Sequence, residues 1–443
     1  MKLGFIRDQA FRNLRGNGHV IRYVATQLAA KAMAAVAQLY AIYVFSRILS
    51  PNDAALVFII FGYGIWIQVF EFGLSQVIQN ALNSKAITFV GACRIISLHY
   101  AIMGFMAVLI VMFPKILGFL LGDRFAHWEG LNVLAFSSGI ALLLVSTNNV
   151  LVQRFLLVIN RAMVASKLVF LQSMFSVLVL LALQWRGATF FESVSVYLLI
   201  PIITFSLLTL NIAKKAFKIT KKDTINWRFI MRNAAGFWGL TALSSIYLGA
   251  DYFFAARYLE NAEMIAYHFS SRLFFISYVA YFSYVQFKAK SIAAEVHLKY
   301  SRRIWIVARE AVAIGVISVA LLLLFAIGIE WSGALDMIGA SGFVVTPLIL
   351  LAAIYYGARV FRDVGLVLIW NLGRQRLLYA VHAAEVFLCL LLLKAFAPVY
   401  GGKGIFAAMA IVSVFSTVVL YAALRRISLS PSYVNTEPRP DAV

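Results

Sequence analysis

Acidic residues are scarce in this 443-residue chain, which has 18 Asp and Glu against 39 Lys and Arg. Charged residues make up only 13% of the sequence, about half of their usual share in a soluble domain. This shortage excludes an ordinary soluble enzyme or binding domain. The hydrophobic share of 63% instead indicates an integral membrane protein, because a bilayer accommodates apolar surface that a soluble core cannot.

Cysteine is equally scarce, with only Cys93 and Cys389 in the whole sequence. A disulfide framework or a structural zinc site needs more cysteines than that. The sequence also lacks the phosphate-binding G-x-x-x-x-G-K-[ST] loop, the G-x-S-x-G elbow and the H-E-x-x-H metal motif. We therefore expect no catalytic residues, no metal site, no cofactor and no ATP-driven pumping by this chain alone.

Long apolar runs are abundant, and each is long enough for a membrane-spanning helix. We predict an all-α integral membrane protein with about twelve spans. A basic linker over 214–232 divides an N-terminal six-helix bundle (1–213) from a C-terminal one (233–427), and a tail follows (428–443). The predicted spans are 20–48, 54–80, 93–113, 131–152, 168–185, 191–212, 233–256, 263–287, 304–329, 343–371, 377–396 and 403–424.

Short matches between the two predicted bundles indicate an internal repeat. Tyr43–Leu49 (YVFSRIL) resembles Tyr252–Leu259 (YFFAARYL), and each segment places an arginine near the outer end of its bundle's first span. Asn160-Arg161 similarly resembles Gly373-Arg374 at nearly the same spacing. Internal repeats of this kind are common in transporters, whose substrate site lies at the interface between the repeats.

The positive charge follows the segments between spans. Most Lys and Arg residues fall in alternate segments, including the N-terminal tail, 214–232 and the C-terminal tail. By the positive-inside rule, both termini and these segments are cytoplasmic. The net charge of +21 is therefore an orientation signal, and we expect no nucleic-acid partner.

Ionisable side chains inside spans are functional candidates, since they are costly in a membrane. Lys31 lies in the first span and either forms an internal cationic site or extends to the interface. Glu71 belongs to a polar stripe (Gln68, Glu71, Ser75 and Gln79) and either couples transport to an ion or pairs with a neighbouring cation. Asp251 is either an ion-coupling acid or an interfacial partner of Arg257 or Arg47.

The eighth and tenth spans carry the remaining candidates. Arg272 either faces a cavity or extends outward from the eighth span. Arg359, Arg362 and Asp363 interrupt the middle of the tenth span, where an extended side chain reaches water least easily. Arg359 and Asp363 are spaced to pair along one helix face, which leaves Arg362 as the expected unpaired cation; the alternative is a self-neutralised cluster in the core. Interior cations suit an anionic substrate, and arginine in particular suits phosphate.

Two turns and one helical element carry a family resemblance. Ser46–Asp53 (SRILSPND) resembles the S-R-x-L-x-P-x-[DE] turn of Wzx-like polysaccharide flippases in the multidrug/oligosaccharidyl-lipid/polysaccharide exporter superfamily. Phe70–Leu74 (FEFGL) resembles that family's D-F-G-L element, with Glu71 in place of Asp. Glu260–Tyr267 (ENAEMIAY) resembles the E-x-G-x-Y turn, although Ile265 replaces the glycine and Ala54-Ala55 stands where Y-G is usual.

The resemblance implies two six-helix bundles around a central cavity and alternating access in the bacterial cytoplasmic membrane. The implied substrate is an undecaprenyl-diphosphate-linked oligosaccharide for O-antigen, capsule or exopolysaccharide. Lys31, Arg272, Arg359 and Arg362 would bind it, while Glu71, Asp251 or Asp363 would respond to ions or protons. Membrane lipids and polysaccharide polymerase or assembly proteins are the implied partners. Two alternatives remain: an ion-coupled multidrug exporter of the same superfamily, and a membrane-embedded polymerase or ligase, which the short outer segments disfavour.

Overall fold

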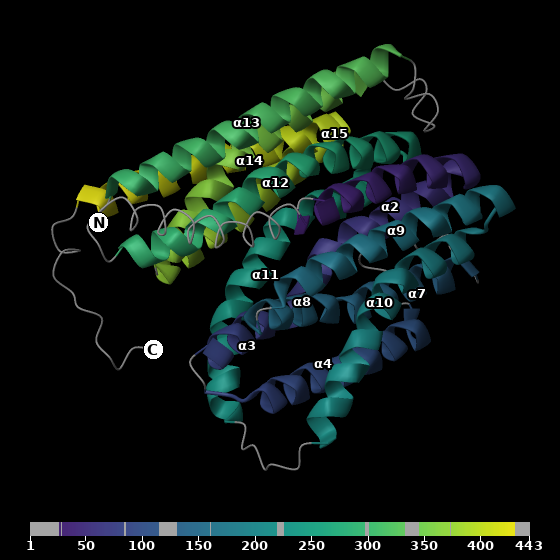
Figure 1. Ribbon diagram of the computed structural model, residues 1–443. Coiled ribbons are helices and arrows are strands. Elements are labelled where there is room, and N and C mark those ends of the chain that lie inside the picture. The colour runs from purple at the N-terminus through teal and green to yellow at the C-terminus, as the bar shows by residue number, and fades with distance from the viewer. Residues whose placement is uncertain are drawn as a thin grey trace, which may run out of the picture.

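The protein is built from α-helices that run in two groups (Figure 1). The computed structural model describes residues 26–27, 29–83, 86–114, 131–159, 161–218, 226–296, 301–332, 345–372 and 374–429, and no strand occurs among them. The N-terminal group comprises the helix Ala29–Ile48, α2 (Pro51–Ile67), the 3-10 turn η1 (Gln68–Glu71), α3 (Leu74–Asn83), α4 (Phe89–Met112), α7 (Leu131–Ser146), α8 (Asn148–Val158), α9 (Ala162–Arg186) and α10 (Phe190–Lys218).

The C-terminal group comprises α11 (Trp227–Tyr258), α12 (Asn261–Val296), α13 (Ser301–Trp331), α14 (Val345–Asn371) and α15 (Gln375–Leu429). Joining α2 with α3 and α7 with α8, and dividing α15 at Gly401, gives twelve crossing segments in the described chain. The predicted all-helical, two-bundle membrane fold is therefore confirmed. Helices α12 to α15 pack on one another on one side of Figure 1, and α2 to α10 lie on the other.

Seven stretches of the described chain are long and apolar enough to cross a membrane by composition alone. Helices α11, α12 and α14 are not among them. These three helices bury Asp251, His268, Arg359, Arg362 and Asp363. Buried charged side chains thus lower the apolar character of these three helices.

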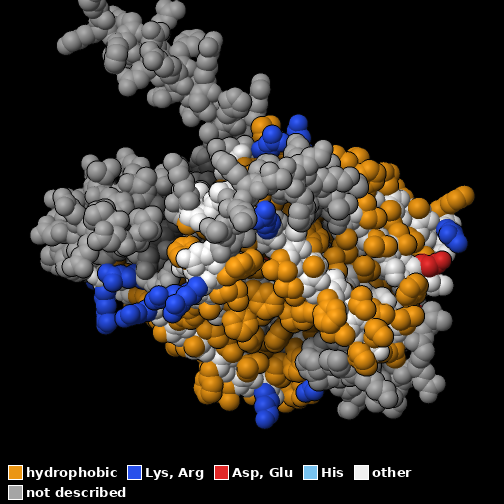
Figure 2. Space-filling model, turned by 90° about the horizontal axis from the view of Figure 1, so that it is seen from below, with side chains coloured by type: hydrophobic (Ala, Val, Ile, Leu, Met, Phe, Trp, Pro, Cys, Tyr) orange, Lys and Arg blue, Asp and Glu red, His pale blue; other side chains and the backbone are white. Residues whose placement is uncertain are grey.

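The outer surface is apolar where lipid would contact it. Figure 2 shows a broad hydrophobic face with Lys and Arg mostly at its margins. Trp185 and Trp331 end α9 and α13 and are 92% and 87% exposed. Tryptophan at helix ends is typical of a membrane–water interface.

The second and fourth crossing segments are broken rather than continuous. Phe72 (φ 54°) and Gly73 (φ 68°) adopt the left-handed conformation that ends η1 before α3 begins. The predicted polar stripe of the second span is therefore wrong, because Ser75 lies on a different helix from Gln68. Instead, Glu71 accepts a hydrogen bond from the Ser75 amide at 2.9 Å and so satisfies a free donor at the start of α3.

The second break follows α7, where polar side chains donate hydrogen bonds to carbonyls at the end of the helix. Thr147 Oγ1 donates to the Leu144 carbonyl at 2.7 Å. The Asn148 amide Nδ2 donates to the Val145 carbonyl at 2.9 Å. Such polar residues compete with the backbone hydrogen bonds of a helix, which explains a break at this position.

Helix α15 changes direction at Gly401, whose φ of 57° and ψ of −137° are not helical. Pro398 precedes the bend. Glu263, at the start of α12, accepts a hydrogen bond from the Gly402 amide at 2.7 Å. The carboxylate thus caps the second part of α15, as acids at helix starts do.

The two groups meet where α2 packs against α11 and α12. At Gly62 on α2, an added Cβ would lie 2.0 Å from the Tyr252 ring on α11. At Gly249 on α11, it would lie 2.3 Å from the Trp66 ring on α2. Each group therefore supplies one glycine and one aromatic ring, and both glycines are needed for the close approach.

The buried apolar residues of the described segments form two separate cores. The larger one extends through the C-terminal group and into α2, α7 and parts of α9 and α10. The second core lies among α3, α8, the first part of α4 and the start of α11. Along α4, Ile96 belongs to the second core and Met103 to the larger one.

Candidate functional site

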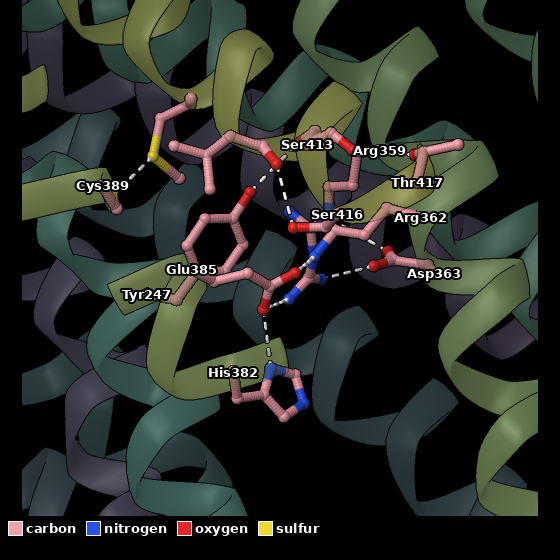
Figure 3. A network of polar contacts seen from close by, with 12 residues as sticks. Tyr247, Arg359, Arg362, Asp363, His382, Glu385, Cys389, Ser413, Ser416 and Thr417 are labelled. Carbon is pink, nitrogen blue, oxygen red and sulfur yellow. Dashed lines mark hydrogen bonds and ion pairs between the residues drawn. The ribbon is translucent and has the colours of Figure 1, made fainter. Parts of the chain in front are cut away.

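A network of charged side chains is buried within the C-terminal group (Figure 3). Arg362 on α14 holds Glu385 on α15 through two parallel hydrogen bonds, from Nε to Oε1 and from Nη2 to Oε2, both 2.6 Å. Its third donor, Nη1, contacts Asp363 Oδ1 at 2.7 Å. Arg362 is 1% exposed and Glu385 0%. The prediction that Arg362 is the unpaired cation is therefore wrong.

The spacing of Glu385 and His382 along α15 brings them into contact. His382 Nδ1 lies 2.7 Å from Glu385 Oε2, so the second partner of this buried acid comes from its own helix. The Arg362 guanidinium also lies 4.3 Å from the centre of the Tyr247 ring. Arg362 and Glu385 together connect α14, α15 and α11 through these contacts. We therefore regard this pair as the structural centre of the C-terminal group.

Arg359 and Asp363 pair as their i, i+4 spacing predicts. Arg359 Nε donates to Asp363 Oδ2 at 3.1 Å, and the Tyr281 hydroxyl donates to the same oxygen at 2.9 Å. Arg359 also lies over the rings of Tyr278 and Tyr356, at 4.9 and 5.7 Å. Arg359 is thus neutralised on one side while aromatic rings cover its faces.

Asp251 is buried on α11, with 5% of its surface exposed. Its carboxylate accepts hydrogen bonds from the Tyr267 hydroxyl at 2.8 Å and from the Tyr252 amide at 2.7 Å. The expected interfacial pairing with Arg257 or Arg47 is wrong, because Arg257 lies over the Phe253 ring and Arg47 donates to Tyr43. Asp251 belongs to the interior.

A small cavity of about 20 Å³ lies where α2, α11, α12 and α14 meet. This volume holds about one water molecule. Asp251, Arg272 and Arg359 line it together with aromatic rings, so three predicted site residues from three helices converge there. The other lining residues are Ile65, Leu248, Tyr252, Ser271, Phe275, Tyr355 and Tyr356.

Arg272 differs from the other two arginines in its partners. Its Nη2 donates to the Phe61 carbonyl on α2 at 3.1 Å, and its guanidinium lies 6.0 Å from the centre of the Tyr252 ring. Within the described part of the chain, no ion pair includes Arg272, whereas Arg359 and Arg362 both have carboxylate partners. Arg272 is therefore the cavity cation whose charge is least compensated.

The remaining predicted residues lie away from this cavity. Lys31 is half-buried near the start of the Ala29–Ile48 helix, and Glu71 is buried at the break before α3. Neither lines the cavity. Arg362 and Asp363 lie directly beside it in the polar network, through Asp363's contact with Arg359.

The tyrosines of the cavity are not among the residues that the sequence predicts for the site. Tyr252 hydrogen-bonds His268 Nδ1 at 2.7 Å, and Tyr356 hydrogen-bonds Ser271 at 3.1 Å. The adjacent pair Tyr355-Tyr356, one turn before Arg359, is the signal for them in the sequence. Tyrosine is also common at membrane interfaces. The spacing alone therefore does not show that these tyrosines lie deep in the bundle.

No family model matches the sequence, and no curated protein matches it significantly. Solved structures are similar in fold. An inward-facing multidrug resistance MATE family transporter of the MOP superfamily is 15% identical, with a TM-score of 0.66 over 91% of this chain and 98% of that one. The lipid II flippase MurJ in an inward closed conformation is 12% identical, with a TM-score of 0.64 over 89% and 86%. A point mutant of the MATE transporter VcmN of Vibrio cholerae is 15% identical, with a TM-score of 0.65 over 94% and 98%. The chain therefore has the fold of these transporters and flippases along nearly its whole length.

Proposed function

We propose that this chain flips an undecaprenyl-diphosphate-linked oligosaccharide across the bacterial cytoplasmic membrane for surface polysaccharide synthesis. The two helix groups would alternate between openings to either side, with the substrate headgroup bound between them. Both termini would be cytoplasmic, and polysaccharide polymerase or assembly proteins would receive the product. The fold shared with a lipid II flippase supports a lipid-linked substrate.

The observation that carries the proposal is Arg272 in the cavity between the two groups. A diphosphate accepts hydrogen bonds from guanidinium donors in a bidentate manner. Among the described residues, the hydrogen bond of Arg272 uses only Nη2, and its partner, the Phe61 carbonyl, is neutral. Arg359 lies beside it and would supply a second cation.

Asp251 gives the cavity a group whose charge can be switched. Ionised, it partly offsets Arg272 and Arg359 across the cavity. Binding of a proton or a cation to Asp251 would raise the positive potential at the cavity and so favour an anionic headgroup. We propose this as the coupling step, with Asp363 and Glu71 as further coupling candidates.

A second candidate is export of cationic drugs, since the fold is equally that of multidrug transporters. The specific observation in its favour is the pairing of Asp251 with the aromatic rings of Tyr252, Phe275, Tyr355 and Tyr356 in one cavity. Organic cations bind aromatic faces and carboxylates. The two candidates therefore predict opposite roles for Arg272 and Asp251.

Native mass spectrometry of the purified protein in lipid nanodiscs distinguishes them. We expect retention of undecaprenyl diphosphate over undecaprenyl monophosphate and over tetraphenylphosphonium. Arg272→Ala should weaken retention of the diphosphate by about tenfold or more, the effect of losing a charge-assisted hydrogen bond. Arg257→Ala is the matched control, because Arg257 lies over Phe253 outside the cavity.

Two results would overturn the proposal. Equal retention of the diphosphate by wild type and Arg272→Ala removes the assigned role of the arginine. Selective retention of tetraphenylphosphonium that Asp251→Asn abolishes would establish the drug exporter instead.

A further inference from the structure

The two helix breaks of the N-terminal group change the hydrogen-bond partners of the backbone carbonyls beside them. In a continuous helix, the Val69 and Phe70 carbonyls would accept from the amides four residues later. The left-handed Phe72 and Gly73 end the helix before this can happen. The Val69 carbonyl accepts instead from the Phe72 amide at 3.2 Å and from Trp238 Nε1 on α11 at 3.0 Å.

His99 on α4 connects this break to the other one. Its Nε2 lies 2.9 Å from the Phe70 carbonyl, and its Nδ1 lies 2.5 Å from Asn148 Oδ1 at the break between α7 and α8. His99 is 2% exposed. One buried ring therefore connects the two breaks described for the N-terminal group.

Both partners of His99 are hydrogen-bond acceptors. Asn148 uses its Nδ2 to donate to the Val145 carbonyl at 2.9 Å, which leaves Oδ1 toward the histidine. Turning the amide over would instead place its oxygen against the Val145 carbonyl. A neutral imidazole has a single N–H, whereas the imidazolium has two. Both contacts are hydrogen bonds only when His99 carries a proton on each nitrogen.

Acidic side chains are few on the elements that surround His99. Helix α4 packs against α3, α7, α8 and α10, and α3 and α7 carry no titratable side chain. The titratable groups on these segments are Glu71 on η1, Arg154 on α8, Glu192, Tyr197, Lys214, Lys215 and Lys218 on α10, and Cys93, Arg94 and Tyr100 on α4 itself. Both acids have hydrogen-bond partners elsewhere: Glu71 accepts from the Ser75 amide and Glu192 from the Thr189 amide. The Phe70 carbonyl belongs to the C-terminal end of η1, where the helix dipole favours a cation.

The boundary between the two hydrophobic cores passes through His99. On α4, the second core ends at Ile96 and the larger core begins at Met103. Leu144 before the α7–α8 break belongs to the larger core, and Leu151 after it belongs to the second. Both breaks and the histidine thus lie at the level where one packed unit ends and the other begins.

We propose that His99 is a protonation-dependent clasp that holds the unit formed by α3, α8 and the first part of α4 to the rest of the N-terminal group. With both ring nitrogens protonated, His99 donates one hydrogen bond to each break, to the Phe70 carbonyl and to Asn148 Oδ1. Loss of one proton removes one of the two hydrogen bonds and frees the unit to tilt about Phe72-Gly73 and Thr147. This device operates whichever substrate the cavity accepts, so its failure leaves the proposed function untouched.

Solid-state nitrogen-15 NMR of the bilayer-reconstituted full chain with labelled histidine tests the protonation state directly. The chain has 6 histidines, and comparison with His99→Gln assigns the signal that belongs to His99. We expect two protonated ring nitrogens at the low end of a pH series and a neutral ring at its high end. A neutral ring with one bare nitrogen across the whole pH range would overturn the proposal.

Hydrogen exchange measured by mass spectrometry tests the clasp itself. At low pH, His99→Gln should exchange the amides at 72–75 and 147–150 about tenfold faster than wild type, since a bond to a charged donor is lost. Raising the pH should bring wild type to the rate of the variant after correction for intrinsic exchange. Leu98→Ala, at a lipid-facing neighbour that is 48% exposed, is the matched control and should match wild type. Equal, pH-independent protection in wild type and His99→Gln would overturn the clasp.

Discussion

Replacing Arg362 by methionine should unfold or strongly destabilise the C-terminal group. Methionine occupies a similar length of side chain but leaves Glu385 and Asp363 without the guanidinium that joins them. Glu385 is 0% exposed, so water cannot take the place of the lost donors. Removing one partner of a buried ion pair costs about 3–5 kcal/mol, because the other charge stays buried and uncompensated.

The two acids should contribute unequally to this loss. Asp363 retains Arg359 and the Tyr281 hydroxyl, so most of its negative charge remains neutralised. Glu385 retains only His382 among its described partners. The penalty should therefore come mainly from Glu385, and neutralising that residue should remove most of it.

Thermal unfolding of the detergent-purified protein, followed by tryptophan fluorescence, measures the effect. Arg362→Met should lower the midpoint by at least about 5 °C, whereas Arg257→Met should leave it near wild type. The double variant Arg362→Met/Glu385→Gln should recover most of the loss. A wild-type midpoint for Arg362→Met, or no recovery in the double variant, would refute the assignment of this pair as the structural centre.

Three further predictions follow from packing, capping and charge. Gly62→Ala should lower the unfolding midpoint and transport because its Cβ would collide with the Tyr252 ring. Gly104→Ala has open space around it and should instead stabilise its helix by about 0.5–1 kcal/mol. Thermal unfolding of both variants checks this difference. Glu263→Gln should cost about 1 kcal/mol through the weaker cap on the Gly402 amide, seen as a small fall in the midpoint without loss of substrate retention. A green fluorescent protein fused to the C-terminus should fluoresce in the cytoplasm, and an alkaline phosphatase fusion there should be inactive, since the basic segments predict that side.

The sequence predicts the spans well because hydrophobic length is a local property. The predicted span 343–371 compares with α14 at Val345–Asn371, and 131–152 with the joined α7 and α8. The pairing of Arg359 with Asp363 is also predictable, since helix geometry alone brings those side chains together.

The sequence-based predictions fail where tertiary structure or backbone conformation decides. Arg362 pairs with Glu385 across two helices, and no spacing along the chain reports that contact. The polar stripe of the second span assumes one continuous helix, but Phe72 adopts a left-handed conformation that non-glycine residues seldom take. His99 carries no signal in the sequence because its partners, a carbonyl and an asparagine, become available only once two helices are broken.

The reciprocal glycine–aromatic contacts between α2 and α11 affect how the N-terminal and C-terminal groups separate. The Tyr252 ring packs on Gly62, and the Trp66 ring packs on Gly249. These two contacts between the helix groups are therefore stabilised by shape complementarity and dispersion rather than by charge. Parting these two contacts exposes no ion, whereas the neighbouring contact of Arg272 with the Phe61 carbonyl is charged. The glycine–aromatic share of the cost of separating the two groups should therefore respond weakly to salt and strongly to the lateral pressure and thickness of the surrounding bilayer.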